Sequence, residues 1–133
     1  MRLGSCALVV SGILLLAGCG GHESPDDAAF HSAVTAGQSG AEVNFDGVIE
    51  ADPLRSGIHE HLLVKAATGE QLEVDHNTDL APWVPAHRGD RVTVRGQLYI
   101  DPGPKLGVHC THAKTSRGCP VPGWVEEAGT YYE

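Results

Sequence analysis

Apolar and polar residues alternate along several stretches of this 133-residue chain, and this alternation constrains the fold more than any other feature. Between Ile58 and Ala66 the even-numbered positions form one face, and the odd-numbered positions, including His59 and His61, form the other. The same period of two recurs at Leu72–His76 and at Arg91–Leu98. Successive side chains of a strand point to opposite faces, so the pattern predicts half-buried strands. We therefore expect an all-β protein.

The remaining segments indicate how many strands the protein contains. A first strand with a bend at Gly47 is expected over Val43–Ile49, and a fifth over Leu106–Thr111. The turn Arg88–Asp90, followed by Val-x-Val-x-Gly, resembles the fourth strand of five-stranded barrels of the OB type. The sequence thus predicts a small five-stranded OB-like barrel over residues 43–133, ending in a hairpin formed by residues 123–132.

A short helix is expected before the barrel. Ser24 offers a capping hydroxyl, Pro25 suits the first helical position, and Gly37 is a typical helix stop. These signals predict a helix over Ala28–Ala36, which is too short to be stable without packing on the barrel.

The N-terminus has the features of a targeting segment. Arg2 precedes an apolar run over Ala7–Ala17, which is too short to span a bilayer. Leu16–Cys19 resembles the lipobox of bacterial lipoproteins, which implies cleavage before Cys19 and lipid attachment to that cysteine. The expected organisation is a signal peptide over residues 1–18, a lipidated tether and helix over 19–42, and the barrel over 43–133. The alternative is a secretory signal in which Cys19 is incidental.

Lipid attachment implies a location and a partner. The mature protein would be anchored in the bacterial cell envelope, with the membrane as partner. Gly20 follows the cysteine where an aspartate would indicate retention in the inner membrane, so we expect the outer membrane and a domain that faces the periplasm. The net charge of −8 argues against nucleic acid as a partner, because nucleic-acid binders usually present a basic face.

The four cysteines have different expected fates. Cys6 leaves with the signal peptide and Cys19 carries the lipid, so Cys110 and Cys119 remain together in an oxidising compartment. We expect a disulfide between them. The alternative, a pair of thiolate metal ligands, lacks the Cys-x-x-Cys spacing of common zinc sites.

Several short segments resemble an uncharacterised bacterial family of small exported proteins, classed as a domain of unknown function. The segments that carry the resemblance are Gly57–His59, His76–Pro82, Gly89–Val92, Gly107–His109, Thr111–His112 and Gly123–Trp124. The resemblance implies no known activity. The chain departs from the family pattern at Ala113 and Lys114, where the family has a second histidine and an aspartate, and at both remaining cysteines, where it has aromatic residues or histidine.

The candidate site is built from polar residues of these segments. We expect them to form a polar edge of the barrel: His59, His76, Asn77, Asp79, His109 and His112. A divalent metal such as Zn²⁺ or Cu²⁺ could be held by three histidines, with Asp75 or Asp79 in support: His59, His76 and His109. The competing interpretation is that His76–Asp79 only fixes a turn, because Asn and Asp side chains bond nearby backbone groups.

The sequence therefore predicts a lipid-anchored binding module whose ligand is a small molecule, a metal ion or an envelope protein. The alternative is a metal-dependent hydrolase, for example a phosphodiesterase, that uses the same histidines with a basic group nearby. A third interpretation is a structural lipoprotein whose histidines are scattered and individually paired.

Overall fold

The computed structural model describes residues 21–103 and 105–133, so the expected signal peptide and Cys19 lie outside the described residues. The described chain forms these elements in order: α1 Asp27–Thr35, β1 Glu42–Ile49, β2 Leu54–Ser56, β3 His59–Ala66, β4 Gln71–Asn77, β5 Arg91–Asp101, β6 Lys105–His109, β7 Trp124–Glu127 and β8 Thr130–Tyr132.

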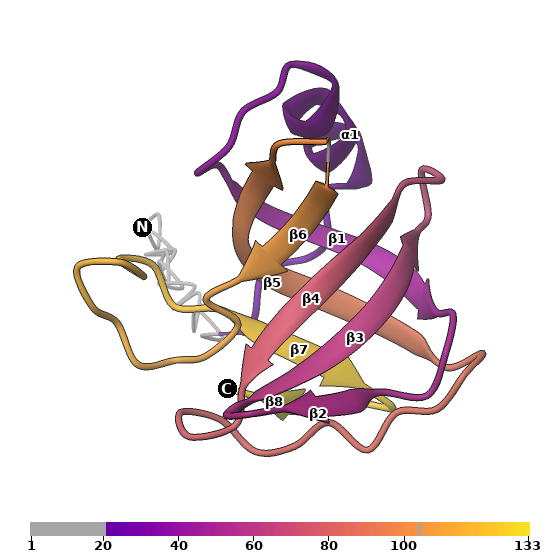
Figure 1. The fold of residues 1–133 in the computed structure, drawn as a ribbon, viewed down its shortest axis with the longest axis vertical. Coiled ribbons are helices and arrows are strands. Elements are labelled where there is room, and N and C mark those ends of the chain that lie inside the picture. Colours follow the sequence, from indigo (N-terminus) through magenta and orange to yellow (C-terminus); the bar gives the residue numbers. More distant parts are fainter. Residues whose placement is uncertain (1–20, 104) are drawn as a thin grey trace, which may run out of the picture.

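Five of these strands close into a barrel (Figure 1). Around the barrel the order is β1, β3, β4, β6 and β5, and β5 pairs again with β1. The β4–β6 pair is parallel, and the other four pairs are antiparallel. The structure thus confirms the predicted small all-β barrel of five strands.

The inward positions of the strands form one apolar core. The alternation seen in the sequence is reproduced in the burial of β3, β4 and β5, where every second side chain lies inside. The largest core side chains include Phe30, Phe45, Ile49, Leu62 and Leu98, all fully buried. Two polar residues, Glu60 and His76, occupy inward positions of the same strands and are also fully buried.

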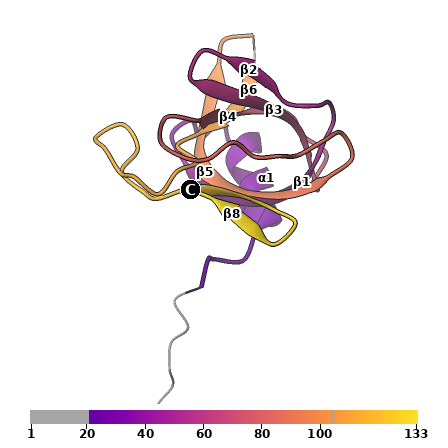
Figure 2. The ribbon, with the colours of Figure 1, turned by 90° about the horizontal axis from the view of Figure 1, so that it is seen from below.

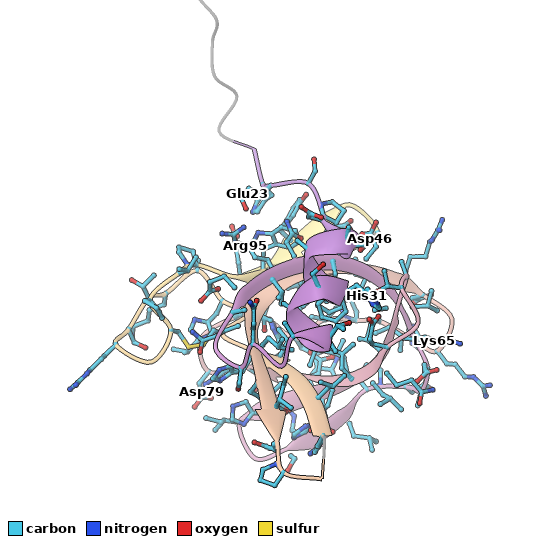
Figure 3. The ribbon with its side chains drawn as sticks, turned by 90° about the horizontal axis from the view of Figure 1, so that it is seen from above. Glu23, His31, Asp46, Lys65, Asp79 and Arg95 are labelled. Atoms are coloured by element: carbon cyan, nitrogen blue, oxygen red, sulfur yellow. A yellow bond between two sulfur atoms is a disulfide. The ribbon has the colours of Figure 1, made fainter. Side chains whose placement is uncertain are left out.

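Different segments cover the two ends of the barrel (Figures 2 and 3). Helix α1 lies over one end, where the ring of Phe30 stacks on Phe45 with 4.1 Å between centroids. Residues 78–90, hereafter the closing loop, cross the opposite end and insert Val84 into the core. Both ends are therefore filled by side chains from outside the five barrel strands.

The helix lies one residue earlier than predicted at both ends, and its cap differs from the predicted one. Asp26, and not Ser24, is the cap, and its carboxylate accepts a hydrogen bond from the N–H of Ala29 at 2.9 Å. Pro25 therefore precedes the helix. Nowhere in residues 21–103 and 105–133 does a helix combine the length and hydropathy that crossing a membrane requires.

Two elements extend the barrel sheet. The β7–β8 hairpin, predicted from the sequence, pairs with β5 through β7. Strand β2 lies in a stretch, Pro53–Gly57, whose sequence predicts only a loop, and it pairs with β3 although all three of its residues are exposed. The predicted disulfide joins Cys110 and Cys119 with their Cα atoms 5.4 Å apart, and it closes the loop between β6 and β7.

Candidate functional site

His76, the central residue of the expected site, points into the barrel. Its Nε2–H donates to the carbonyl of Pro82 at 2.9 Å, and its Nδ1 accepts from the hydroxyl of Thr111 at 2.8 Å. Burial lowers the pKa of His76, which favours the neutral ring that this pattern requires. Both nitrogens are occupied, so His76 ties β4 to the closing loop and does not offer a lone pair to a metal.

Glu60 lies directly opposite His76 in the β3–β4 pair. Its Oε2 accepts a hydrogen bond from the backbone N–H of Val84 at 2.8 Å, whereas its buried Oε1 has no hydrogen-bond partner among the described residues. Burial raises the pKa of Glu60 to about 7, against the opposing effects of the Val84 N–H and the charge of Arg55. The carboxyl group therefore keeps its proton to a much higher pH than an exposed glutamate does.

The residues after His76 form a turn. Asn77 Oδ1 accepts a hydrogen bond from the N–H of Asp79 at 2.9 Å, and the hydroxyl of Thr78 donates to the carbonyl of Ile58 at 2.8 Å. Short polar side chains commonly stabilise turns in this way. These contacts support the interpretation of this motif as a turn that starts the closing loop.

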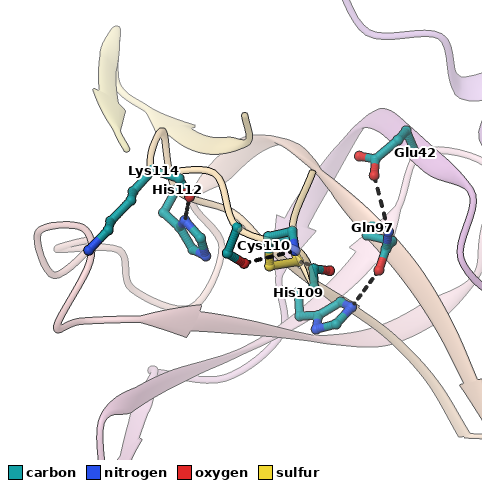
Figure 4. Close-up of a disulfide and its surroundings, with 9 residues drawn as sticks. Glu42, Gln97, His109, Cys110, His112 and Lys114 are labelled. Atoms are coloured by element: carbon teal, nitrogen blue, oxygen red, sulfur yellow. Dashed lines mark hydrogen bonds between the residues drawn. A yellow bond between two sulfur atoms is a disulfide. The ribbon is translucent and has the colours of Figure 1, made fainter. Parts of the chain in front are cut away.

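His109 and His112 make separate contacts on either side of the disulfide (Figure 4). His112 is almost fully buried, and its Nδ1–H donates to the carbonyl of Lys114 at 2.7 Å. The Nε2–H of His109 donates to Oε1 of Gln97 at 3.1 Å on the outer face of the barrel. Partial burial lowers the pKa of His109, and the charge of nearby Asp75 opposes this effect.

The three expected metal ligands do not share one face of the barrel. His59 and His109 lie on the outer face, whereas His76 is inside. The physical reason is the period of two, because His76 belongs to the inward set of β4 together with Leu72 and Val74. In the described part of the chain, the group whose ligating atoms do converge consists of other residues.

That group lies on the outer face of the β3–β4 hairpin and comprises His61, Glu73 and Asp75. Its nitrogen and oxygen atoms all lie within 4.8 Å of one another. Nδ1 of His61 is 2.8 Å from Oδ1 of Asp75 and 3.0 Å from Oε1 of Glu73. The register brings the three together, because His61 stands directly opposite Asp75 and Glu73 is two positions along the same face.

These short contacts are not hydrogen bonds. Nδ1 of His61 and Oδ1 of Asp75 are buried, and neither has a hydrogen-bond partner within residues 21–103 and 105–133. Two ligands of a tetrahedral zinc ion stand about 3.3 Å apart, because each bond is about 2.0–2.1 Å long. The two separations from Nδ1 of His61 are slightly shorter than this, and all three ligating atoms lie within 4.8 Å of one another.

Tyr99 and Gly107 hold Asp75 from the other side. The hydroxyl of Tyr99 donates to Oδ2 of Asp75 at 2.7 Å, which leaves Oδ1 directed toward His61. Tyr99 reaches across β6 above Gly107, where a Cβ atom would lie only 1.9 Å from Cζ of the tyrosine ring. Burial and this hydrogen bond both raise the pKa of Tyr99, so its hydroxyl remains protonated as a donor.

The family comparison accounts for most of the chain. The family described as "Protein of unknown function (DUF3465)" matches residues 13–133. The chain belongs to this family. A comparison with curated proteins finds no match. The expected uncharacterised family is therefore confirmed, and the activity of this DUF3465 chain has to be argued from its own residues.

Sequence reasoning in this DUF3465 chain named Asp75 only as support for other histidines and did not select His61 or Glu73, although the signal was present. The turn between β3 and β4 sets Lys65 opposite Gln71, and counting back from that pair places His61 opposite Asp75. The alternation then places all three side chains on the outer face. The contribution of Tyr99 had no such signal, because it depends on how β5 and β6 pair.

Proposed function

We propose that this DUF3465 protein is a lipid-anchored binding module of the bacterial cell envelope, and that it binds one divalent transition-metal ion. The ligands are His61, Glu73 and Asp75 on the outer face of the barrel. The lipobox-like Leu16–Cys19 supports the lipid anchor, and the disulfide supports an oxidising location. The rest of the proposal depends on the geometry of the three side chains.

The observation that carries the proposal is the pair of buried, unpartnered atoms, Nδ1 of His61 and Oδ1 of Asp75. An imidazolium–carboxylate ion pair would place an N–H along the line to the oxygen, and these two atoms do not have that geometry despite their separation of 2.8 Å. Burying a polar atom without a partner costs about 1–3 kcal/mol. A cation between the ligands would satisfy both atoms.

The donor set selects the class of ion. One imidazole and two carboxylates suit zinc and neighbouring divalent transition metals, whereas calcium and magnesium prefer oxygen donors alone. Two carboxylates also attract a cation electrostatically. Lys105 forms an ion pair with one of these carboxylates, with its Nζ 3.5 Å from Oε1 of Glu73. We expect the ion to displace this weak, exposed contact.

Tyr99 would orient Asp75 as an outer partner of the ion. Groups that hydrogen-bond to a metal ligand fix its direction, and their loss typically costs about 10–100-fold in metal affinity. The Tyr99–Asp75 hydrogen bond has this arrangement, because it occupies the carboxylate oxygen that does not face His61.

The test is a zinc titration of the chain from Gly21 to Glu133, which retains every described helix and strand. Isothermal calorimetry and metal analysis would be compared for wild type, His61→Ala and Asp75→Asn. His59→Ala is the matched control, since His59 lies on the same face of β3 with its ring 6.3 Å from that of His61. We expect one zinc per chain in wild type and control, and a loss of affinity of more than about 100-fold in the other two variants.

Two results would contradict this assignment. One is a wild type that retains no zinc at micromolar concentration. The other is zinc that is lost in His59→Ala but kept in His61→Ala, which would return the metal to the histidines first indicated by the sequence.

A metal-dependent hydrolase is the second candidate function. Three protein ligands leave a coordination position for water, and Lys105 beside Glu73 could bind an anionic substrate. Two surface cavities, of about 480 and 510 Å³, lie instead against β1 and are not lined by the three ligands. Binding is therefore the better-supported function, and we expect zinc-loaded wild type to hydrolyse a chromogenic phosphodiester no faster than His61→Ala.

A further inference from the structure

The segment expected to be a free tether is bound along the barrel. We propose that residues 22–26, hereafter the strap, hold the barrel against the membrane in one orientation. In this orientation the β7–β8 hairpin faces the lipid surface and the face that carries His61 points away. The proposal rests on the lipid anchor at Cys19 included in the proposed function, and it does not depend on metal binding.

His22 docks on the aromatic side chains of the terminal hairpin. Its ring stacks on Tyr131, with centroids 3.5 Å apart and planes 9° apart, and it meets the ring of Trp124 edge-on at 5.4 Å. Its Nε2 lies 2.9 Å from Oε2 of Glu133. His22 is therefore held both by aromatic stacking and by a polar contact, as a docked residue would be.

The next residues of the strap bind β1 and β5. The side-chain amide of Asn44 donates to the carbonyls of Glu23 and Ser24 at 2.9 and 3.0 Å, and the N–H of Asp26 donates to the carbonyl of Asn44 at 2.8 Å. The carboxylate of Glu23 also pairs with Arg95 on β5, beside the start of the helix (Figure 3). Side-chain and backbone groups of the barrel thus hold consecutive residues of the strap.

Docking of the strap shortens the connection to the anchor. His22 is three positions after Cys19 in the sequence, and three residue steps span at most about 11 Å when fully extended. Had the chain been free up to the helix at Asp27, eight residues would have reached roughly 26–29 Å, about the width of a small domain. A barrel held at the shorter distance cannot rotate freely above the bilayer.

The path of the strap determines which side of the barrel faces the lipid. In Figure 2 the first described residues, 21–26, join the barrel on the side of β8, and β2, β3 and β4 lie on the opposite side. Tyr131 is 39% exposed on the hairpin, and tyrosine and tryptophan are favoured at membrane interfaces. The His61 face on β3 and β4 would then be open to the periplasm.

The test measures the distance of two positions from the bilayer. A fluorescent amino acid would be placed at Thr130 on the hairpin or at Leu54 on β2, both exposed, in the full-length lipidated protein. The protein would be reconstituted in phosphatidylcholine vesicles that contain an acceptor lipid. We expect markedly more energy transfer from Thr130 than from Leu54.

The control lengthens the connection and leaves every docking contact in place. An insertion of about twelve Gly and Ser residues between Gly20 and Gly21 adds a flexible coil of roughly 19 Å. In this variant we expect the two positions to transfer energy equally. Asn44→Ala, which releases the strap from β1, should reduce the difference in the same direction.

Failure of the anchor and failure of the orientation can be told apart. Recovery of the chain free of the vesicles would overturn the lipid anchor, and the orientation with it. Vesicle-bound wild type with equal transfer from Thr130 and Leu54 would overturn the orientation alone and would leave the anchor and the metal site intact.

Discussion

Replacing Glu60 with glutamine should remove a specific part of the pH dependence of stability. Burial raises the pKa of this carboxyl group from its ordinary value of 4.5 to about 7 in the folded protein. The folded state therefore holds a proton that the unfolded state has already lost, and stability falls as the pH rises from about 4.5 through 7. The stabilising contribution is fully present below the lower value and is lost above the higher one.

The magnitude follows from the two pKa values. At about 1.36 kcal/mol per pH unit, the full difference corresponds to about 3 kcal/mol. Between pH 5 and pH 8 the linkage relation gives a loss of about 2.5 kcal/mol. Glutamine resembles the protonated acid and can still accept the hydrogen bond from Val84, so Glu60→Gln should not show this loss.

Urea denaturation followed by circular dichroism at pH 5, 6, 7 and 8 would measure the effect. With slopes of about 1–3 kcal/mol/M, the midpoints of wild type and Glu60→Gln should diverge by about 1–2 M between pH 5 and pH 8. Glu42→Gln is the control, because Glu42 is exposed on β1 and should keep the wild-type profile. An equal fall in stability for wild type and Glu60→Gln would refute the reasoning.

Three further predictions concern other parts of the barrel. His76→Ala removes two buried hydrogen bonds and should destabilise the protein by about 3–4 kcal/mol in urea denaturation. Folding lowers the pKa of His76, so the stability of wild type should fall as the pH drops below about 6.5. The variant lacks this imidazole and should show a smaller fall. Gly107→Ala displaces Tyr99 from above β6 and should lower the free energy of unfolding by about 1–3 kcal/mol. In the calorimetric titration it should also lower zinc affinity by about 10-fold or more. Cys110→Ser opens a loop with a sequence separation of 9 and should cost about 2–3 kcal/mol in thermal or urea unfolding while zinc affinity is unchanged.

The parts of the fold that sequence reasoning could predict are those set by local periodicity. The alternation in Ile58–Ala66 and Leu72–His76 predicted both strands of the central hairpin and which side of each lies inside. Strand β2 was missed because its three residues are exposed, so no alternation marks it. The helix cap was misassigned because Ser24 and Asp26 are both acceptable caps, and the contact of Asp26 with β1 decides between them.

The candidate site was less predictable because it depends on pairing between strands. The inward phase of His76 could be read from β4, but its contacts with Thr111 and Pro82 arise from segments that meet only in the closed barrel. The convergence of His61 and Asp75 could have been found from the hairpin register. The role of Gly107 could not, because it depends on the ring of Tyr99 from a different strand.

The most direct test of the central claim is a crystal structure of the zinc-loaded protein with anomalous diffraction recorded at the zinc edge. We expect one strong anomalous peak on the outer face of the β3–β4 hairpin. The ion should lie about 2.0–2.1 Å from Nδ1 of His61 and about 2.0–2.2 Å from an oxygen of Glu73 and of Asp75. A peak at other residues, or a zinc-free site in which His61 donates an ordinary hydrogen bond to Asp75, would contradict it.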